Sequence, residues 1–448
     1  MKELEMERML DQAYEAFIRF RKSSRFVRAQ LLQCIAQGIS DRRSEFVETI
    51  INEARKPKAL AEVEVNRAIQ TFMIASEEAK RFGGEIIPLD SEASSQEFDP
   101  ALSTWVPRGV VLAITPFNFP LNLVAHKVAP ALAVGASVIV KPPPQAPGAA
   151  VLLGEVFDEI QKKEASLQNA LQVVQASHEE ISHAIRDPRV AVLSFTGSDQ
   201  VGWMLQEKAY RKKVVLELGG NAGVIVHEDA DLKRAASRCA YGGFAYSGQV
   251  CISVQRILVH EKIRADFQEL FLQEVSKIKS GNPREEGVLV GPLIDQKSAD
   301  RVFSWIESAQ NNGAEVLIGG KREENLIYPT VMTGVSHEHS LWTEEVFGPV
   351  VLLESYRDFD EALEKLNSSR YGLQAGVFTK NYPLIQKARD QLEVGCVVIN
   401  EVPTFRADHM PYGGMKDSGQ GREGVRFAME EFSERKIFVT WRGLTPLA

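Results

Sequence analysis

The chain has 448 residues, of which 44% are hydrophobic and 25% charged, as is usual for globular proteins. Its 52 basic and 60 acidic residues leave a formal net charge of −8, so there is no electrostatic reason to expect nucleic acid or an anionic membrane surface as a partner. The longest apolar run, 128–140, is interrupted by Pro130 and Gly135 and is well short of the ~20 residues of a membrane span. We expect two or three domains of ~100–200 residues each.

Four cysteines, Cys34, Cys239, Cys251 and Cys396, lie far apart in the sequence, and none is clustered with histidine. This spacing indicates neither a disulfide framework nor a zinc site, so no metal is expected. The first residues alternate charged and apolar side chains and lack the uninterrupted apolar region of a secretory signal. A reducing, cytoplasmic location is therefore expected.

The predicted elements begin with helices. Up to about residue 85 the apolar residues recur at helical spacing, as at Leu31, Leu32, Ile35 and Ile39. A polar and acidic stretch at 88–100 predicts an exposed excursion. Apolar, β-rich runs then alternate with helical ones. Buried strands are predicted at 110–114, 137–140, 190–195 and 214–217. This alternation predicts a parallel, doubly wound α/β sheet.

A second α/β series follows, and the break between the two series is expected near Gly219 and Gly220. A helix is predicted at about 263–279. Strands are predicted at 256–259, 350–353 and 397–400. The last apolar run, 436–441, predicts a strand that stays exposed unless another chain covers it, which points to assembly.

Two groups that suit covalent chemistry on a carbonyl stand in this middle region. Cys251 follows the run Ser247-Gly248-Gln249-Val250, and Glu217 opens the run Glu217-Leu218-Gly219-Gly220. A thiol can attack a carbonyl carbon, and a carboxylate can activate water. Most isolated cysteines are simply small buried side chains, so the assignment depends on the surrounding motifs.

Seven motifs carry a resemblance to the aldehyde dehydrogenase superfamily, from about residue 25 to the end, and they occur in that family's order. They are Ile114-Thr115-Pro116-Phe117-Asn118-Phe119-Pro120, Val140-Lys141-Pro142, Phe195-Thr196-Gly197-Ser198, Glu217-Leu218-Gly219-Gly220, Gly248-Gln249-Val250-Cys251, Glu345-Val346-Phe347-Gly348-Pro349 and Pro411-Tyr412-Gly413-Gly414-Met415-Lys416-Asp417-Ser418-Gly419. The separation of thiol and carboxylate, 251 − 217 = 34 positions, also matches that family. In its motifs the chain most resembles the lactaldehyde and semialdehyde dehydrogenase-like members.

The resemblance implies an aldehyde dehydrogenase-like α/β fold of three parts. Residues 1–88 and 107–218 would form a Rossmann-like cofactor-binding domain, and residues 219–428 an α/β catalytic domain. Residues 89–106 and 429–448 would form a small β extension that pairs between subunits. A homodimer or homotetramer is therefore expected.

The resemblance also implies a mechanism. The Cys251 thiolate would add to the aldehyde, and the Asn118 amide and the Cys251 backbone N–H would stabilise the oxyanion. After oxidation to a thioester, Glu217 would activate the hydrolytic water. Two alternatives remain open: an acylating enzyme that passes the thioester to coenzyme A, and a non-catalytic member that keeps the fold and the cofactor cleft.

The implied cofactor is NAD or NADP, although no GxGxxG fingerprint follows the first strand. Carried over by motif, the expected cofactor residues are Ile114, Thr115, Pro116, Phe117, Lys141, Phe195, Thr196, Gly197, Ser198, Val201, Gly202, Leu218, Glu345 and Phe347. Pro144 stands where NAD-preferring members often have glutamate. The absence of that carboxylate removes repulsion against a 2′-phosphate, so NADP is admissible.

The substrate is expected to be a short aldehyde with a distal carboxylate or hydroxyl, such as a semialdehyde or lactaldehyde. Arg406 lies in a segment that borders the substrate tunnel in related enzymes, and a guanidinium suits an anion; a surface salt bridge is its alternative role. His126 resembles a tunnel position too, or is a buried core histidine. Val250, which precedes the nucleophile, argues against a strongly phosphate-directed pocket.

Overall fold

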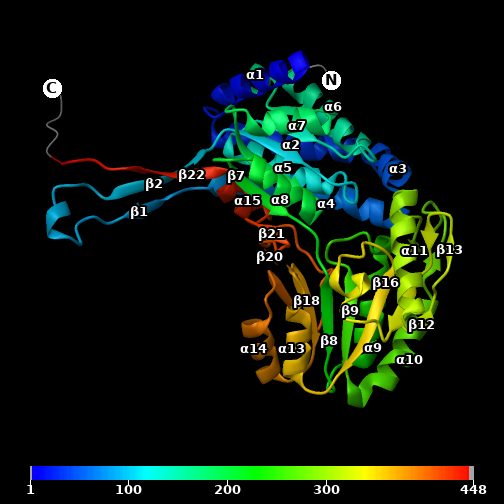
Figure 1. The fold of residues 1–448 in the computed structure, drawn as a ribbon. Coiled ribbons are helices and arrows are strands. Elements are labelled where there is room, and N and C mark those ends of the chain that lie inside the picture. Colours follow the sequence, from blue (N-terminus) through cyan, green and yellow to red (C-terminus); the bar gives the residue numbers. More distant parts are fainter. Residues whose placement is uncertain (1–2, 443–448) are drawn as a thin grey trace, which may run out of the picture.

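The computed structural model describes residues 3–442 and contains two α/β domains and a projecting β extension (Figure 1). The first domain is built on a sheet of order β21-β7-β6-β3-β4-β5. Its strands are β3 (Val110–Ile114), β4 (Val138–Lys141), β5 (Leu171–Val173), β6 (Val190–Thr196), β7 (Lys213–Glu217) and β21 (Gly419–Gln420). All are parallel except β21, which runs antiparallel to β7. The predicted doubly wound sheet is confirmed.

Helices cover both faces of this sheet because its strands carry apolar side chains on both sides. One face packs against α2 (Arg25–Asp41), α3 (Arg43–Ala54), α4 (Lys58–Arg81), α5 (Asn122–Val134), α6 (Gly148–Gln161) and α15 (Val425–Glu431). The other packs against α1 (Glu3–Phe20), α7 (His178–Arg186) and α8 (Asp199–Lys208). Along β3, Val111 and Ala113 enter the first core, and Val110 and Leu112 enter the second.

The second domain is built on a sheet of order β12-β15-β16-β9-β8-β18-β19, in which only β12 is antiparallel to its neighbour. The strands are β8 (Ala222–Val226), β9 (Val254–His260), β12 (Glu315–Ile318), β15 (Thr330–Thr333), β16 (Val350–Tyr356), β18 (Gln374–Phe378) and β19 (Cys396–Ile399). Helices α9 (Leu232–Phe244) and α10 (Arg264–Ser276) cover one face. Helices α11 (Gln296–Asn311), α12 (Ser340–Thr343), α13 (Phe359–Asn367) and α14 (Tyr382–Gln391) cover the other.

Short elements complete the two domains. Two-stranded pairs are formed by β10 (Lys279–Ser280) with β11 (Val288–Val290), β13 (Arg322–Glu323) with β14 (Leu326–Ile327), and β17 (Tyr371–Gly372) with β20 (Met415–Lys416). Single 3₁₀ turns occur at η1 (Ala93–Ser95), η2 (Ala165–Leu167), η3 (Ala245–Gly248) and η4 (Glu261–Ile263). In residues 3–442, no helix is long and apolar enough to cross a membrane.

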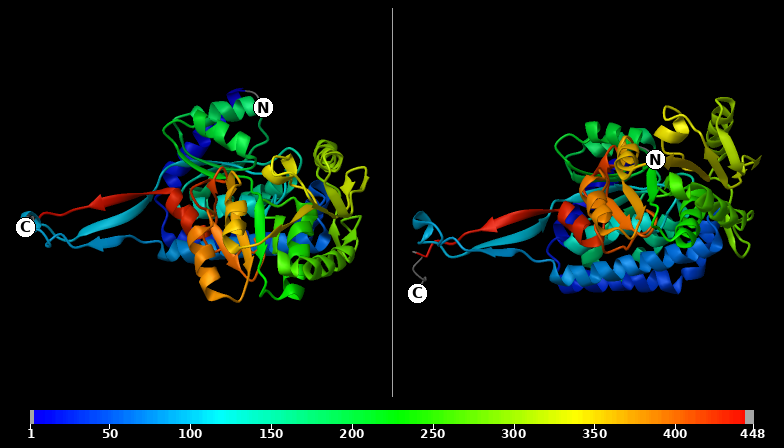
Figure 2. Two further views of the ribbon diagram at one scale, coloured as in Figure 1. Left: turned by 60° about the horizontal axis from the view of Figure 1, so that its bottom comes forward. Right: turned by 90° about the horizontal axis from the view of Figure 1, so that it is seen from below.

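The extension is an antiparallel sheet of β1 (Glu85–Ile87), β2 (Ala101–Pro107) and β22 (Ser433–Phe438), in that order. It projects away from the body of the molecule in all three views (Figures 1 and 2). Apolar side chains on it remain exposed, and they include Ile86, Leu102, Ile437 and Phe438. Residues 443–448 of the predicted extension lie outside the described part of the chain.

The structure departs from the predicted domain boundaries in two places. Residues 85–87, assigned from the sequence to the cofactor domain, pair with β2 in the extension. Strand β21, assigned to the catalytic domain, and helix α15, divided between the catalytic domain up to residue 428 and the extension from residue 429, join the first sheet and its core instead. The reason is strand pairing and packing between segments far apart in the sequence, which a linear division cannot anticipate.

Candidate active site

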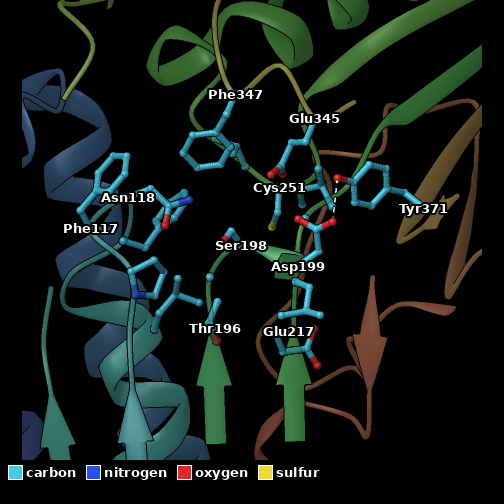
Figure 3. A pocket seen from close by; sticks show the side chains of 18 of the residues that line it. Phe117, Asn118, Thr196, Ser198, Asp199, Glu217, Cys251, Glu345, Phe347 and Tyr371 are labelled. Carbon is cyan, nitrogen blue, oxygen red and sulfur yellow. Dashed lines mark hydrogen bonds between the residues drawn. The ribbon is translucent and has the colours of Figure 1, made fainter. Parts of the chain in front are cut away.

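A cavity of about 590 Å³ is lined by residues of both α/β domains, at the carboxyl ends of β6 and β7 (Figure 3). The predicted residues that line it are Pro116, Phe117, Asn118, Thr196, Gly197, Ser198, Glu217, Leu218, Cys251, Glu345, Phe347 and Arg406. The thiol, the carboxylate and the amide, which come from three separate motifs spread over residues 118–251, therefore meet in one cavity.

The other predicted residues are not among those that line the cavity: Ile114, Thr115, Lys141, Phe195, Val201, Gly202 and His126. The Phe195 ring packs against Gly197, where an added Cβ would lie 2.6 Å from the ring. Gly202 allows α8 to approach Leu218, whose Cδ2 would lie 2.3 Å from an added Cβ. Lys141 is half-buried at the end of β4, and burial lowers its pKa. Pro144 is exposed and carries no charge toward a ribose or its phosphate.

Cys251 follows a tightly held loop between α9 and β9. Tyr246, Ser247 and Gly248 all have positive φ, at 52°, 57° and 70°. Two consecutive non-glycine residues in this region are costly and need support from their surroundings. The Ser247 hydroxyl donates to the Gly291 carbonyl at 2.7 Å and accepts its N–H at 2.9 Å, and the Tyr246 hydroxyl donates to the Ala54 carbonyl at 2.7 Å. These bonds fix the direction from which Cys251 enters the cavity.

The turn between β7 and β8 needs its two glycines for close approach. A Cβ on Gly220 would lie 2.3 Å from the Cys251 carbonyl oxygen, and a Cβ on Gly219 would lie 2.6 Å from a Glu345 carboxylate oxygen. Ser418 holds the turn, because its hydroxyl donates to the Gly219 carbonyl at 2.7 Å. The Glu-Leu-Gly-Gly motif thus allows the domain junction to pack directly on the nucleophile loop.

Asn118 is oriented by the loop that carries the nucleophile. Its Nδ2 donates one hydrogen bond to the Gln249 carbonyl at 3.0 Å. An amide nitrogen has two hydrogens, so the second remains for another acceptor. Asn118 is 3% exposed and lines the cavity. This geometry suits a donor to an oxyanion formed near Cys251.

Glu217 is a buried carboxyl group without a hydrogen-bond partner on either oxygen. Burial, and after it the nearby Glu423 carboxylate, raise its pKa well above the ordinary value. Glu423 itself pairs with Lys127 at 2.9 Å and with Arg406 at 3.3 Å. Because these cations pair with Glu423, Glu217 keeps the character of a weak acid, as a general base for neutral pH requires.

Cys251 rests as a thiol. Burial raises its pKa to about 12, and the Glu345 and Glu217 carboxylates add to the increase, while a hydrogen bond from Tyr412 and the Arg406 charge oppose it. A thiol is a weak nucleophile, so attack requires a group that accepts its proton or stabilises the thiolate.

The other end of the cavity fits a dinucleotide. Ser198 precedes α8 and its hydroxyl makes no capping bond, so this hydroxyl and the first N–H groups of the helix remain for a phosphate. The Asp199 charge at this terminus is offset by a salt bridge to Arg370. Glu345 accepts the Gly220 N–H at 3.0 Å, and burial raises its pKa to about 7. The Phe347 ring meets Phe117 edge-on at 5.9 Å, which forms an apolar wall for a flat ring.

Two guanidinium groups, of Arg406 and Arg67, line the part of the cavity that we expect to receive the substrate. The Arg406 side chain is 8% exposed, and its Nε has no hydrogen-bond partner. Arg67, from α4, lines the same cavity and uses Nε and Nη2 to donate to Asp408, at 3.1 and 2.6 Å. His126 does not line the cavity; its Nε2 bonds Asp408 at 2.9 Å. His126 is therefore a buried histidine that supports the Asp408–Arg67 pair.

Sequence reasoning did not single out Arg67, Lys127 or Glu423. Lys127 gave a signal, since it is a lone charge inside the very apolar helix α5, and a buried lysine requires a partner. Arg67 lies on an amphipathic helix among other charged residues, where nothing in the sequence distinguishes it. Glu423 is far from Lys127 in the sequence. It comes close because β21 pairs with β7 and because Glu423 pairs with Tyr412 in an antiparallel bridge.

Comparison with known proteins identifies the family. A model described as "Aldehyde dehydrogenase family" matches residues 1–438. The 3-sulfolactaldehyde dehydrogenase of Priestia aryabhattai is 42% identical, over 93% of this chain and 86% of that protein. The lactaldehyde dehydrogenase of Methanococcus vannielii is 40% identical, over 92% and 87%. The chain belongs to the aldehyde dehydrogenase family. It is an NAD(P)-dependent oxidoreductase.

Solved structures of this family agree. Aldehyde dehydrogenase 21 of Physcomitrella patens, in complex with the reaction product succinate, has a TM-score of 0.96 and 40% identity, covering 99% of this chain and 92% of that one. The glyceraldehyde-3-phosphate dehydrogenase of Methanocaldococcus jannaschii, complexed with NADP, has a TM-score of 0.94 and 37% identity, covering 98% and 95%. The predicted fold and the NAD or NADP cofactor are confirmed.

The raised pKa of Glu217 predicts a pH-dependent effect on stability. Below the ordinary glutamate pKa of about 4.3, the folded and unfolded states both hold the proton. Above it, the unfolded state releases the proton while the folded state resists, so stability falls as pH rises. Glu217→Gln should therefore melt higher than the parent at pH 8, by about 2 °C or more, and at nearly the same temperature at pH 4.5.

Differential scanning fluorimetry across this pH range measures the effect. Glu159→Gln, at an exposed position on α6, is the matched control and should show no such trend. A melting difference for Glu217→Gln that does not change with pH would contradict the assignment.

Proposed function

We propose that the protein oxidises a short aldehyde with a distal anionic group to the free carboxylic acid, through a covalent intermediate on Cys251. The observation that carries this proposal is the meeting of the Cys251 thiol, the Asn118 amide and the Glu217 carboxyl in a cavity whose other end fits a dinucleotide.

In the first step the Cys251 thiol releases its proton to solvent, and the sulfur adds to the aldehyde carbon and gives a tetrahedral thiohemiacetal. The free Nδ2 hydrogen of Asn118 and the Cys251 backbone N–H donate to the developing oxyanion. NAD or NADP, when bound, supplies the hydride acceptor that converts this intermediate into a thioester. Phe117, Phe347 and Glu345 would hold the reactive end of the cofactor beside Cys251.

In the second step Glu217 removes a proton from water, and the water attacks the thioester and releases the acid. The buried position of Glu217 supports this role, because its raised pKa makes the carboxylate a stronger base than an exposed one. The thiolate leaves and takes up the proton that Glu217 received from water, which restores both groups to their starting state.

Two variants test the mechanism. Cys251→Ala should abolish NADH or NADPH formation at 340 nm. Glu217→Gln should produce one equivalent of reduced cofactor in a burst and then turn over at least about 100-fold more slowly, since loss of a general base costs about 10²–10⁴ in rate. Mass spectrometry should then find the acylated Cys251. Turnover by Cys251→Ala would overturn the proposal, and a rate that depends on coenzyme A with a thioester product would favour the acylating alternative.

Two arginines with unused donors support the anionic substrate. Arg406 keeps Nε unpaired inside the cavity wall, and Arg67 keeps Nη1 after its two bonds to Asp408. A guanidinium presents donors in the geometry that a carboxylate or sulfonate accepts. The names of the related proteins are consistent with this choice: 3-sulfolactaldehyde carries a sulfonate, and succinate is the product of a semialdehyde that carries a carboxylate. Lactaldehyde is neutral, which makes a direct comparison of charged and neutral aldehydes decisive.

Arg67→Gln tests the charge preference with 4-oxobutanoate against butanal, which differ in the distal carboxylate. We expect KM for 4-oxobutanoate to rise about tenfold or more, the effect of losing one hydrogen bond to a charged group, with little change for butanal. Arg426→Gln, on α15 outside the cavity, is the control and should change neither value. An equal rise in KM for both aldehydes would show that Arg67 does not recognise the anionic group.

The β extension is proposed to pair with a second copy of the chain, as a homodimer or a dimer of dimers. Strand β22 is an edge strand, and Ile437 and Phe438 on it are 50% and 61% exposed. Unpaired strand edges with apolar side chains need a partner to be stable in water.

Light scattering on the full chain measures this directly. We expect two or four times the 49.8 kDa of one chain, and Phe438→Glu should shift the population toward the monomer. A monomer at micromolar concentration of the unaltered protein would contradict the proposal.

A further inference from the structure

The Cys251 sulfur has a hydrogen-bond partner that the mechanism above does not use. The Tyr412 hydroxyl lies 3.0 Å from Sγ. Within residues 3–442 it is the one side chain that hydrogen-bonds this sulfur. We infer that Tyr412 is a further catalytic residue: its hydroxyl donates to the Cys251 thiolate, orients the sulfur toward the substrate and stabilises the charge on it. This inference rests on the proposed role of Cys251 as the nucleophile.

The position of Tyr412 is fixed by its surroundings. Its N–H donates to the Glu423 carbonyl at 3.0 Å, and its carbonyl accepts the Glu423 N–H at 2.7 Å. The ring is 4% exposed and packs with Ile252, Leu373 and the Cys251 segment. A hydroxyl held in this way keeps its geometry without new ordering when the thiolate forms.

The environment keeps Tyr412 a donor. Burial raises its pKa well above the ordinary tyrosine value, so the hydroxyl retains its proton in the range where the enzyme would work. The Arg406 guanidinium lies over the ring, 3.8 Å from its centroid. This positive charge draws electron density from the ring and strengthens the O–H as a donor.

A hydrogen-bond donor is needed here because the other charged groups near the sulfur have opposing effects on a thiolate. Glu345 and Glu217 oppose a thiolate, while Arg406 favours it but is paired with Glu423. Hydrogen bonds to charged groups are about twice as strong as those between neutral groups. The Tyr412 bond therefore strengthens when Cys251 loses its proton and again when the thiolate leaves the thioester, so both chemical steps depend on it.

Alkylation of Cys251 in the protein without cofactor or substrate tests the inference independently of turnover. Iodoacetamide reacts with the thiolate, and mass spectrometry of the Cys251 peptide separates this site from the three other cysteines. Tyr412→Phe removes only the oxygen. We expect its alkylation rate at pH 8 to fall about tenfold or more, the rate–pH profile to move to higher pH by about one unit, and kcat/KM to fall in parallel.

Tyr356→Phe is the matched control. It also removes a buried tyrosine hydroxyl, which bonds His227 Nδ1 at 2.8 Å and lies outside the cavity. It should leave the Cys251 profile unchanged. An unchanged profile and rate in folded Tyr412→Phe would overturn the inference.

If Tyr412→Phe does not fold, 3-fluorotyrosine at position 412 keeps the size and makes the phenol a stronger donor. The alkylation profile should then move to lower pH, and an unmoved profile would also overturn the inference. Turnover by Cys251→Ala would overturn the proposed function but would leave the Tyr412 effect on alkylation measurable.

Discussion

The close approach of a side-chain-free turn to the nucleophile loop is the constraint on which the active site depends. Gly219 and Gly220 join the two sheets, and any side chain at Gly220 would meet the Cys251 carbonyl. The turn is held from the far end of the chain by Ser418. This contact brings three parts of the chain together: the carboxyl at the end of β7, the thiol before β9 and the last motif of the chain. Neither glycine has a positive φ: Gly220 is required for the distance between two backbones, and at Gly219 an added Cβ would meet the Glu345 carboxylate.

The charges of the site are arranged so that the reactive groups stay weakly acidic. Lys127 and Arg406 both pair with Glu423, and Glu217 is buried with no hydrogen-bond partner on either oxygen. A direct salt bridge to Glu217 would lower its pKa and remove its use as a base near neutral pH. Among the described residues, the one side chain that hydrogen-bonds Cys251 is the neutral hydroxyl of Tyr412. The buried ion pairs beside the site thus influence the protonation of Glu217 and Cys251 without forming a salt bridge to either of them.

The sequence predicted the strands of both sheets well where they are apolar and bounded by turns. Strand β3 begins and ends where predicted, at Val110–Ile114, because both faces of a buried parallel strand are apolar. Pairings between distant segments were not predictable. Strand β1 follows a helix in sequence but joins the extension, and β21 returns to the first sheet from the catalytic segment. The backbone hydrogen bonds of a strand leave no periodic pattern in the sequence that identifies the partner strand.

The candidate active site likewise combines features that the sequence predicted with features that it did not. The sequence by itself determined which residues are proposed to react, Cys251, Glu217 and Asn118, because covalent oxidation of an aldehyde requires such groups and they stand in recognisable motifs. Only the tertiary structure decided which charges surround them. It placed Arg67 in the same cavity as Arg406, kept His126 out of the cavity lining with a hydrogen bond to Asp408, and brought the Tyr412 hydroxyl to the sulfur. A motif records which group reacts, whereas protonation and substrate charge depend on burial and distance, which exist only after the chain has folded.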